Sequence, residues 1–154
     1  MRRNDREISN TQEIEEIIGK ADVCRIALSD NNIPYIVPMN FGYTSDPEQT
    51  LFFHCANAGK KLDMIRKNNY TCFEMDVDHL LHKAKKACDW GMRYSSIIGY
   101  GYITIVTEKE TKIKGLDCIM THYGGKEEYF YNEKVLEQTT ILRLKIMEMT
   151  GKTK

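Results

Sequence analysis

The chain has 154 residues, enough for one domain with a substantial core and too few for two independent domains. Its 22 basic and 22 acidic residues give a formal net charge of zero, which argues against the basic surplus typical of proteins that bind nucleic acid or acidic membranes. Five cysteines, without a C-x-x-C pair, predict reduced thiols rather than a disulfide framework. No apolar run suits a secretory signal or a membrane span, so we expect a cytoplasmic protein.

The first predicted element is a short amphipathic helix. Its apolar side chains follow the helical spacing i, i+3, i+4 at Ile14, Ile17 and Ile18. Asn10 is suited to cap the helix, with Glu13 three residues later, and Gly19 is expected to end it.

A hairpin is predicted next. Val23–Leu28 alternates as a strand does, and Ser29–Asn32 has turn-forming side chains. The run Tyr35–Tyr43 also alternates and predicts one long second strand. One of its faces would carry Tyr35, Val37, Met39, Phe41 and Tyr43.

A third strand, Leu51–Cys55, is expected to lead into a helix that runs to about Lys67. Asn57 is the predicted cap of this helix, and Leu62 and Ile65 are its expected buried side chains.

The second half of the chain predicts further strands and one helix. A half-exposed strand, Thr71–Val77, precedes a polar loop from His79 to Asp89. Tyr94–Thr107 predicts a long strand in which Gly99 and Gly101 indicate a bulge or a close backbone approach. A helix from about Lys109, stopped by Gly124-Gly125, and a last strand, Thr139–Met149, complete the order.

Antiparallel strands with short turns and little βαβ alternation favour a mainly β fold. We therefore expect a small closed barrel with peripheral helices, formed by residues 1–154 as one domain.

Gly59-Lys60-Lys61 is the most suggestive polar motif. The first amides of a helix have no partner inside the helix, and with the helix dipole and two ammonium groups they would form an anion site. An exposed first turn that simply contains lysines is the alternative.

Pro38 lacks an amide hydrogen, so its strand should lie at a sheet edge at that point. The amides of Met39, Asn40 and Phe41 would then be free to bond the polar edge of a planar ligand. An ordinary edge-strand proline is the alternative.

His54 is either a satisfied histidine at the rim of the core or an acid–base group beside a redox ring. Its neighbour Cys55 is expected to be a small strand residue. Ligand types also occur at Asp76, Asp78, His79 and His82. Because a metal centre needs further ligands in a defined geometry, we expect no metal there.

The segment Trp90–Ser96 combines an aromatic ring with an arginine, a tyrosine and two hydroxyl groups. Such a segment could stack on a planar ring and bond a phosphate. Alternatively, Trp90 fills the mouth of the barrel.

Several of these segments, in this order, resemble the pyridoxamine-phosphate-oxidase-like flavin-binding split-barrel superfamily, and most closely its nitroimidazole-resistance (Nim) branch. The matching segments are PYIVPMNFGY, LFFHCANAGKKLDMIRKN, CFEMD, WGMRYSSIIGYG and the terminal strand running into TGK.

The resemblance implies a six-stranded split β-barrel that forms a homodimer, with one FMN in each groove at the subunit interface. It implies a cofactor site formed by Val37, Pro38, Met39, Asn40, Phe41, His54, Cys55, Lys60, Lys61, Trp90, Tyr94, Ser95 and Ser96. Lys60 and Lys61 would hold the phosphate, and His54 would be the catalytic group near the ring.

The C-terminal sequence ILRLKIMEMTGKTK lacks the arginine- and tryptophan-bearing segment of true pyridoxamine-phosphate oxidases. A role in vitamin B6 synthesis is therefore not expected. The hypothesis is an FMN-dependent oxidoreductase that reduces a small electron-poor, nitroaromatic-like substrate. The alternatives are a dimer that binds flavin or haem without turnover and a barrel that has lost its cofactor; other family members bind haem or a deazaflavin, so the fold alone does not identify the ligand.

Overall fold

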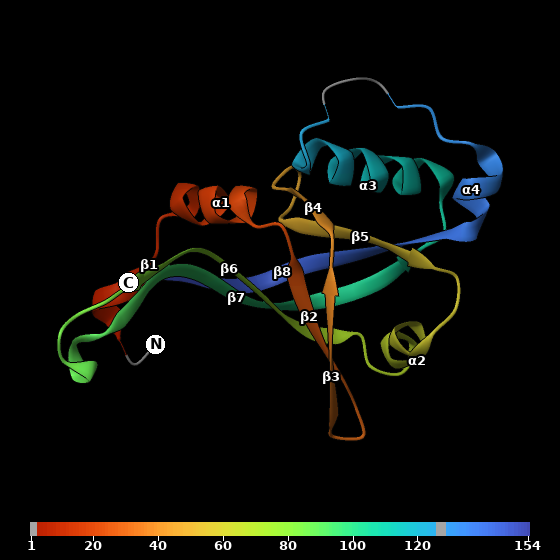
Figure 1. Cartoon of the computed structure of the whole chain (residues 1–154). Coiled ribbons are helices and arrows are strands. Elements are labelled where there is room, and N and C mark those ends of the chain that lie inside the picture. Colours follow the sequence, from red (N-terminus) through yellow and green to blue (C-terminus); the bar gives the residue numbers. More distant parts are fainter. Residues whose placement is uncertain (1–2, 126–128) are drawn as a thin grey trace.

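The computed structural model describes residues 3–125 and 129–154. Its strands form one antiparallel sheet in the order β3-β2-β6-β7-β8-β5-β4, and β1 pairs with β8 (Figure 1). The strands are β1 (Glu7–Ile8), β2 (Cys24–Asp30), β3 (Ile33–Met39), β4 (Phe41–Thr44), β5 (Thr50–Ala56), β6 (Tyr70–His82), β7 (Gly91–Val106) and β8 (Thr139–Thr153). The helices are α1 (Thr11–Lys20), α2 (Lys60–Lys67), α3 (Lys109–His122) and α4 (Glu133–Gln138), with short 3-10 turns at Asn4–Arg6 and Ala87–Asp89.

Asn40 is the single residue between two strands that lie at opposite ends of the sheet order. β3 pairs only with β2, and β4 pairs only with β5. The chain therefore closes the sheet into a barrel at this corner. The predicted single strand Tyr35–Tyr43 was wrong in this respect, because the strand changes its neighbour at Asn40. The predicted common face was confirmed, and it points inward: Met39 and Phe41 are buried in the core, and the other three side chains pack against it.

The core lies inside the barrel, where alternate strand residues meet. Among its most buried side chains are Phe41, Phe53 and Phe73 from three different strands. α1 and α3 cover one side of the barrel, and α2 lies at its other end (Figure 1). The predicted mainly β class with peripheral helices is thus confirmed, with eight strands where six were expected.

The ends of α1 and the end of α3 agree with local sequence signals to within about a residue. The Asn10 side chain accepts a hydrogen bond from the backbone N–H of Gln12, so the predicted cap of α1 is confirmed. α1 continues one residue past Gly19 and ends at Lys20. Gly124 has a φ of +92°, the left-handed conformation expected after α3. No helix among the described residues is long and apolar enough to cross a membrane.

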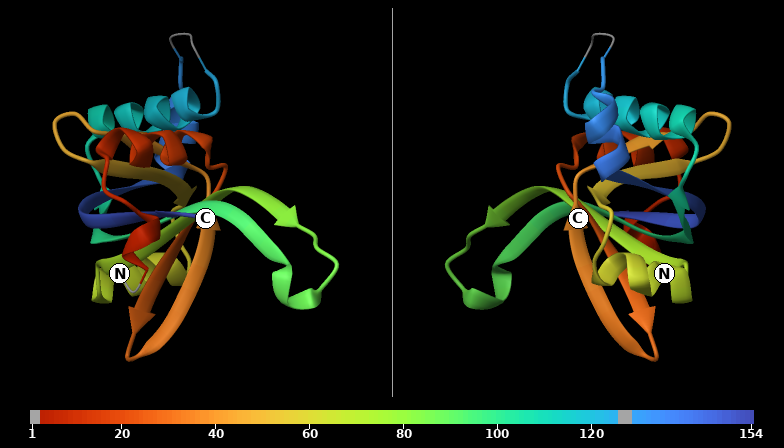
Figure 2. Two further views of the ribbon diagram at one scale, coloured as in Figure 1. Left: turned by 90° about the vertical axis from the view of Figure 1, so that its left-hand side faces the viewer. Right: turned by 90° about the vertical axis from the view of Figure 1, so that its right-hand side faces the viewer.

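The predicted polar loop from His79 to Asp89 was wrong over its first half. β6 continues to His82, which pairs with Gly91 of β7. The register shifts between Val77 and Leu80, where Asp78 takes a positive φ of 58°. Beyond this bulge the two strands form a projecting hairpin, residues 78–93, which we call the arm (Figure 2). Alternation could not predict it, because His79, Leu80 and Leu81 interrupt the period of two.

A register shift in the pairing of β7 with β8 confirms the bulge predicted from the glycines of β7. The shift lies between Tyr100 and Gly101. A Cβ atom on Gly101 would lie 2.1 Å from the carbonyl oxygen of Lys145, so glycine is needed here for a close backbone approach. The short elements β1 and α4 had not been predicted, because two and six residues carry too little periodicity.

Candidate functional site

The lysine motif lies at the N-terminus of α2, but Asn57 is not its cap. The cap position is Gly59, which has a φ of +137° and provides no side-chain hydrogen bond. The Asn57 side chain instead donates to the carbonyl oxygen of Glu137 at 2.8 Å and accepts from Thr140 Oγ1 at 2.7 Å. Asn57 therefore ties the end of β5 to the α4–β8 junction, and the first turn of α2 is left without a side-chain cap.

Two lysines join this helix end to two strands. The Lys60 ammonium lies 4.3 Å from the centre of the Tyr35 ring of β3. Lys61 is close enough to Cys55 of β5 for its charge to oppose the rise that burial causes in the thiol pKa. The structure thus places Lys60 beside Tyr35 and lets the charge of Lys61 act on Cys55, and the assignment of these residues to a cofactor site stays a prediction. Lys60 also lines a cavity of about 330 Å³ with Asp30 of β2, Ile33 of β3 and other residues of α2.

β3 is an edge strand, so the prediction made from Pro38 is confirmed. The hairpin turn at Asn31 and Asn32 has two residues, both with positive φ. In such a hairpin the closing pair is hydrogen bonded and every second pair after it is too. Pro34 and Pro38 occupy the alternate positions, opposite Ser29 and Arg25 of β2. At these positions the backbone groups of β3 point away from β2.

The amides predicted to be free are only partly so. Met39 lies opposite Cys24 at a position whose amide points toward β2. The Phe41 N–H donates to the Tyr123 hydroxyl at 3.2 Å. The exposed edge of β3 therefore presents the carbonyl groups of Pro34, Ile36 and Pro38 and the one N–H of Ile36, since proline has none. The side chain of Val37 packs against the core.

His54 is exposed and lies opposite Ile141 of β8. Because neighbouring strand residues point to opposite faces, its ring points away from the side on which Cys55 packs against the core. Within one chain, His54 therefore does not join the Lys60–Tyr35 cluster.

The remaining predicted residues lie on or beside the arm. Trp90 is 48% exposed, and its indole N–H donates to the carbonyl oxygen of Ala84 at 2.7 Å. The Ser95 hydroxyl lies 3.1 Å from Thr153 Oγ1, and the Lys152 ammonium lies 5.6 Å from the centre of the Tyr94 ring. Ser96 pairs with Asp76 and Lys152 across the two neighbouring strands.

These residues and the Lys60–Tyr35 cluster lie near opposite ends of the long ladder formed by β6 and β7. α2 leads directly into Tyr70, which pairs with Tyr102, and the arm ends where His82 pairs with Gly91. Gly91 and Tyr102 are eleven positions apart on β7, a path of about 36 Å along the strand. One chain thus carries two separated halves of the predicted site (Figure 1).

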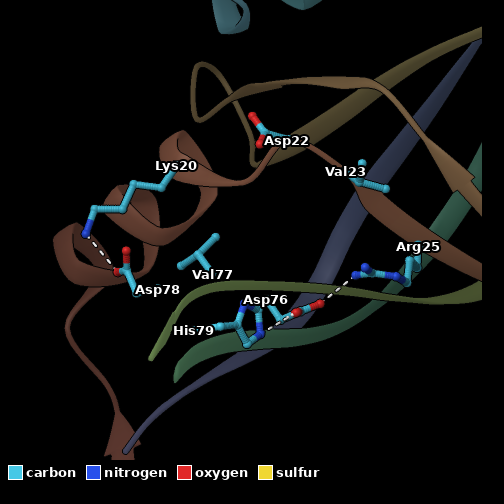
Figure 3. A pocket seen from close by; sticks show the side chains of 8 residues that line it. All are labelled: Lys20, Asp22, Val23, Arg25, Asp76, Val77, Asp78 and His79. Atoms are coloured by element: carbon cyan, nitrogen blue, oxygen red, sulfur yellow. Dashed lines mark hydrogen bonds and ion pairs between the residues drawn. The ribbon is translucent and has the colours of Figure 1, made fainter. Parts of the chain in front are cut away.

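A charged cavity of about 450 Å³ lies at the base of the arm (Figure 3). Asp76 bridges Arg25 of β2 and His79, with its Oδ2 2.7 Å from His79 Nε2. Asp78 pairs with Lys20 of α1 at 3.0 Å. Asp76, Asp78 and His79, considered above as metal-ligand types, are thus engaged in ion pairs, and His82 lies farther along the arm. The partners Lys20 and Arg25 are about 50 residues away in sequence and carry no local signal for this contact.

Comparisons with known proteins agree with this architecture. Residues 10–153 match the family model described as pyridoxamine 5'-phosphate oxidase. A candidate 5-nitroimidazole antibiotic resistance protein from Bacteroides thetaiotaomicron VPI-5482 is 34% identical, with a TM-score of 0.83 over 96% of this chain and 86% of its own.

Two other solved structures are similar in fold at 16% identity. They are the flavocytochrome Anf3 from Azotobacter vinelandii (TM-score 0.83, covering 100% of this chain and 72% of its own) and a FAD and heme binding protein from Mycobacterium smegmatis (TM-score 0.84, covering 96% and 73%). A comparison with curated proteins finds no match.

Proposed function

Because the chain belongs to the pyridoxamine 5'-phosphate oxidase family, we propose that it binds FMN and reduces a small electron-poor substrate such as a nitroaromatic compound. The 34% identical relative, described as a candidate 5-nitroimidazole antibiotic resistance protein, supports this substrate class. Bound FMN would supply the redox chemistry, and the protein would supply position and electrostatics.

The observation that carries the proposal is the uncapped N-terminus of α2. Gly59 leaves the first helix turn without a side-chain cap, and Lys60 and Lys61 add two positive charges there. A phosphate monoester suits this site, because helix amides and ammonium groups both stabilise an anion. The exposed edge of β3 lies beside it, since Lys60 contacts Tyr35. The carbonyl groups along this edge of β3 suit the polar rim of a flat heterocycle.

We further propose that two copies of the chain form the site together. The outer face of the sheet exposes several large apolar side chains beside charged ones such as Arg25 and Glu74, whereas the water-exposed face of an antiparallel sheet is normally polar. Cross-strand pairing places five exposed side chains on this one face: Ile36, Tyr70, Ile98, Tyr100 and Tyr102. A second copy is the expected cover, because an extended apolar patch of this kind is typical of a protein–protein interface.

A dimer also explains the two separated halves. The arm of one copy would bring Trp90, Tyr94, Ser95 and Ser96 to the α2 groove of the other. Trp90 would pack over the ring and limit the size of the substrate. His54 is exposed and is our candidate for the proton donor to the reduced substrate.

A visible absorption spectrum tests the cofactor. Protein incubated with FMN and then freed of unbound flavin by desalting should keep the two-band flavin spectrum, and protein treated in parallel with FAD should retain less flavin, because the lysine pair suits one terminal phosphate. Absence of both spectra would refute flavin binding. Addition of a reduced nicotinamide and then a nitroimidazole should bleach and restore the bands. A flavin that binds but does not cycle would instead support the non-catalytic binding module.

A further inference from the structure

Tyr123, just beyond α3, holds the corner at which the barrel closes. Its hydroxyl donates to the carbonyl oxygen of Asp22 at 2.7 Å. It accepts hydrogen bonds from Asn40 Nδ2 at 3.0 Å and from the Phe41 N–H at 3.2 Å. A tyrosine hydroxyl has one donor and two acceptor positions, so this hydroxyl is fully used.

His122 fixes the same helix end. Its Nε2 lies 2.8 Å from the carbonyl oxygen of Ala21, and its ring centre lies 4.2 Å from that of Phe41. Met39 pairs with Cys24 and Phe41 pairs with Phe53, but Asn40 between them has no strand partner among the described residues. The residues that hold it therefore come from α3 and its end, more than 80 positions later in sequence.

This arrangement determines which atom of the Asn40 amide faces outward. Nδ2 is engaged by Tyr123 and also lies 3.5 Å from the carbonyl oxygen of Asp22. The remaining polar atom is Oδ1, a hydrogen-bond acceptor on an exposed side chain. Asn40 directly follows the strand whose outward carbonyl groups are those of Pro34, Ile36 and Pro38, along which Ile36 provides the one N–H. The edge is therefore rich in acceptors and poor in donors.

We infer that Tyr123 is a positioning residue that orients Asn40 Oδ1 to accept a hydrogen bond from a ring N–H of the bound cofactor. This inference rests on the proposed flavin site and states which residues of that site recognise the flavin ring. The acceptor-rich edge selects a heterocycle with an N–H on its rim, as at N3 of a flavin, over a ligand whose rim offers only acceptors.

The test compares FMN with FMN methylated at ring N3, which lacks that N–H. Both ligands are titrated into the same preparations of wild type, Tyr123→Phe, Asn40→Ala and Tyr131→Phe. Tyr131 is the matched control, because its hydroxyl donates to Asp117 of α3 at 2.7 Å and has no contact with the corner.

Wild type and Tyr131→Phe should bind FMN about tenfold more tightly than the methylated form, and this ratio should fall to about threefold or less in Tyr123→Phe and Asn40→Ala. A general loss of stability would weaken both ligands together and leave the ratio unchanged. An equal ratio in wild type and Tyr123→Phe, or no discrimination by wild type, would overturn the inference while the flavin site stands. Failure of wild type to bind FMN at all would overturn both.

Discussion

The Lys60 ammonium lies 4.3 Å from the centre of the Tyr35 ring. This contact joins the start of α2 to the exposed edge strand of the barrel, although the two residues are on separate elements. A phosphate held at the helix and a ring laid along the strand would therefore belong to one ligand. A mononucleotide has both parts.

Replacing Lys61 by alanine should weaken FMN binding at least tenfold, because the phosphate would lose a charged partner at an uncapped helix start. Isothermal titration measures the change. Lys67→Ala is the matched control, since it removes a lysine that pairs with Asp30 from the other end of the same helix. Equal affinities of Lys61→Ala and wild type would remove Lys61 from the site.

Tyr100→Arg should convert a dimer into a monomer. Tyr100 lies on the outer face, where its ring stacks with that of Tyr70 at 6.1 Å, and burying a charge there in an interface would be costly. Light scattering should give twice 17.9 kDa for wild type and 17.9 kDa for the variant. Met120→Arg, an exposed substitution on α3, should stay dimeric. A dimeric Tyr100→Arg protein would place the interface elsewhere.

Trp90 is the one tryptophan of the chain, so its emission reports on the arm without interference. FMN should quench this emission in wild type, because the proposed dimer brings the arm of one copy to the flavin of the other. At the same bound fraction of FMN, quenching should be lost in a monomeric Tyr100→Arg protein. Quenching that persists in the monomer would assign the arm to the site of its own chain.

Two glycines should respond to alanine in opposite directions. Gly101→Ala would place a Cβ 2.1 Å from the Lys145 carbonyl oxygen and should lower the free energy of unfolding by about 1–3 kcal/mol. Gly19 lies in α1 with open space around it, so Gly19→Ala should raise it by about 0.5–1 kcal/mol. Urea denaturation measures both, and a Gly101→Ala protein as stable as wild type would contradict the close approach.

The raised pKa of the Glu74 carboxyl group predicts that the stability of the fold depends on pH. Burial, and next the charge of Asp76, raise the pKa of its carboxyl group above the ordinary value. The folded state then holds this proton more tightly than the unfolded state, so the stabilisation is present below the ordinary pKa and is lost as the pH rises through the raised pKa.

The stability of Glu74→Gln relative to wild type should therefore increase with pH across that window, as measured by urea midpoints between pH 4 and 8. Glu133 has the opposite shift, since its hydrogen bond to Lys109 lowers its pKa. The relative stability of Glu133→Gln should accordingly fall as the pH rises, starting below the ordinary carboxyl pKa. A difference between Glu74→Gln and wild type that does not vary with pH would contradict the shift.

Much of the site could be predicted from short-range patterns. The glycine and two lysines indicated the start of α2, for which anion binding is proposed, and Pro38 indicated an edge strand, because both signals depend on backbone chemistry at the residue itself. The cap of α2 was misassigned because Asn57 has distant partners, at Glu137 and Thr140, that compete for its side chain.

The sequence by itself determined the mainly β class and most of the longer strands and helices, because periods of two and 3.6 residues and turn-forming side chains act over a few positions. Only the tertiary structure decided that β3 and β4 lie at opposite ends of one sheet, that Tyr123 holds Asn40, and that the arm projects away from the α2 groove. These relationships join residues that are many positions apart. Their geometry is set by closure of the barrel, in which each strand's partner depends on all the others.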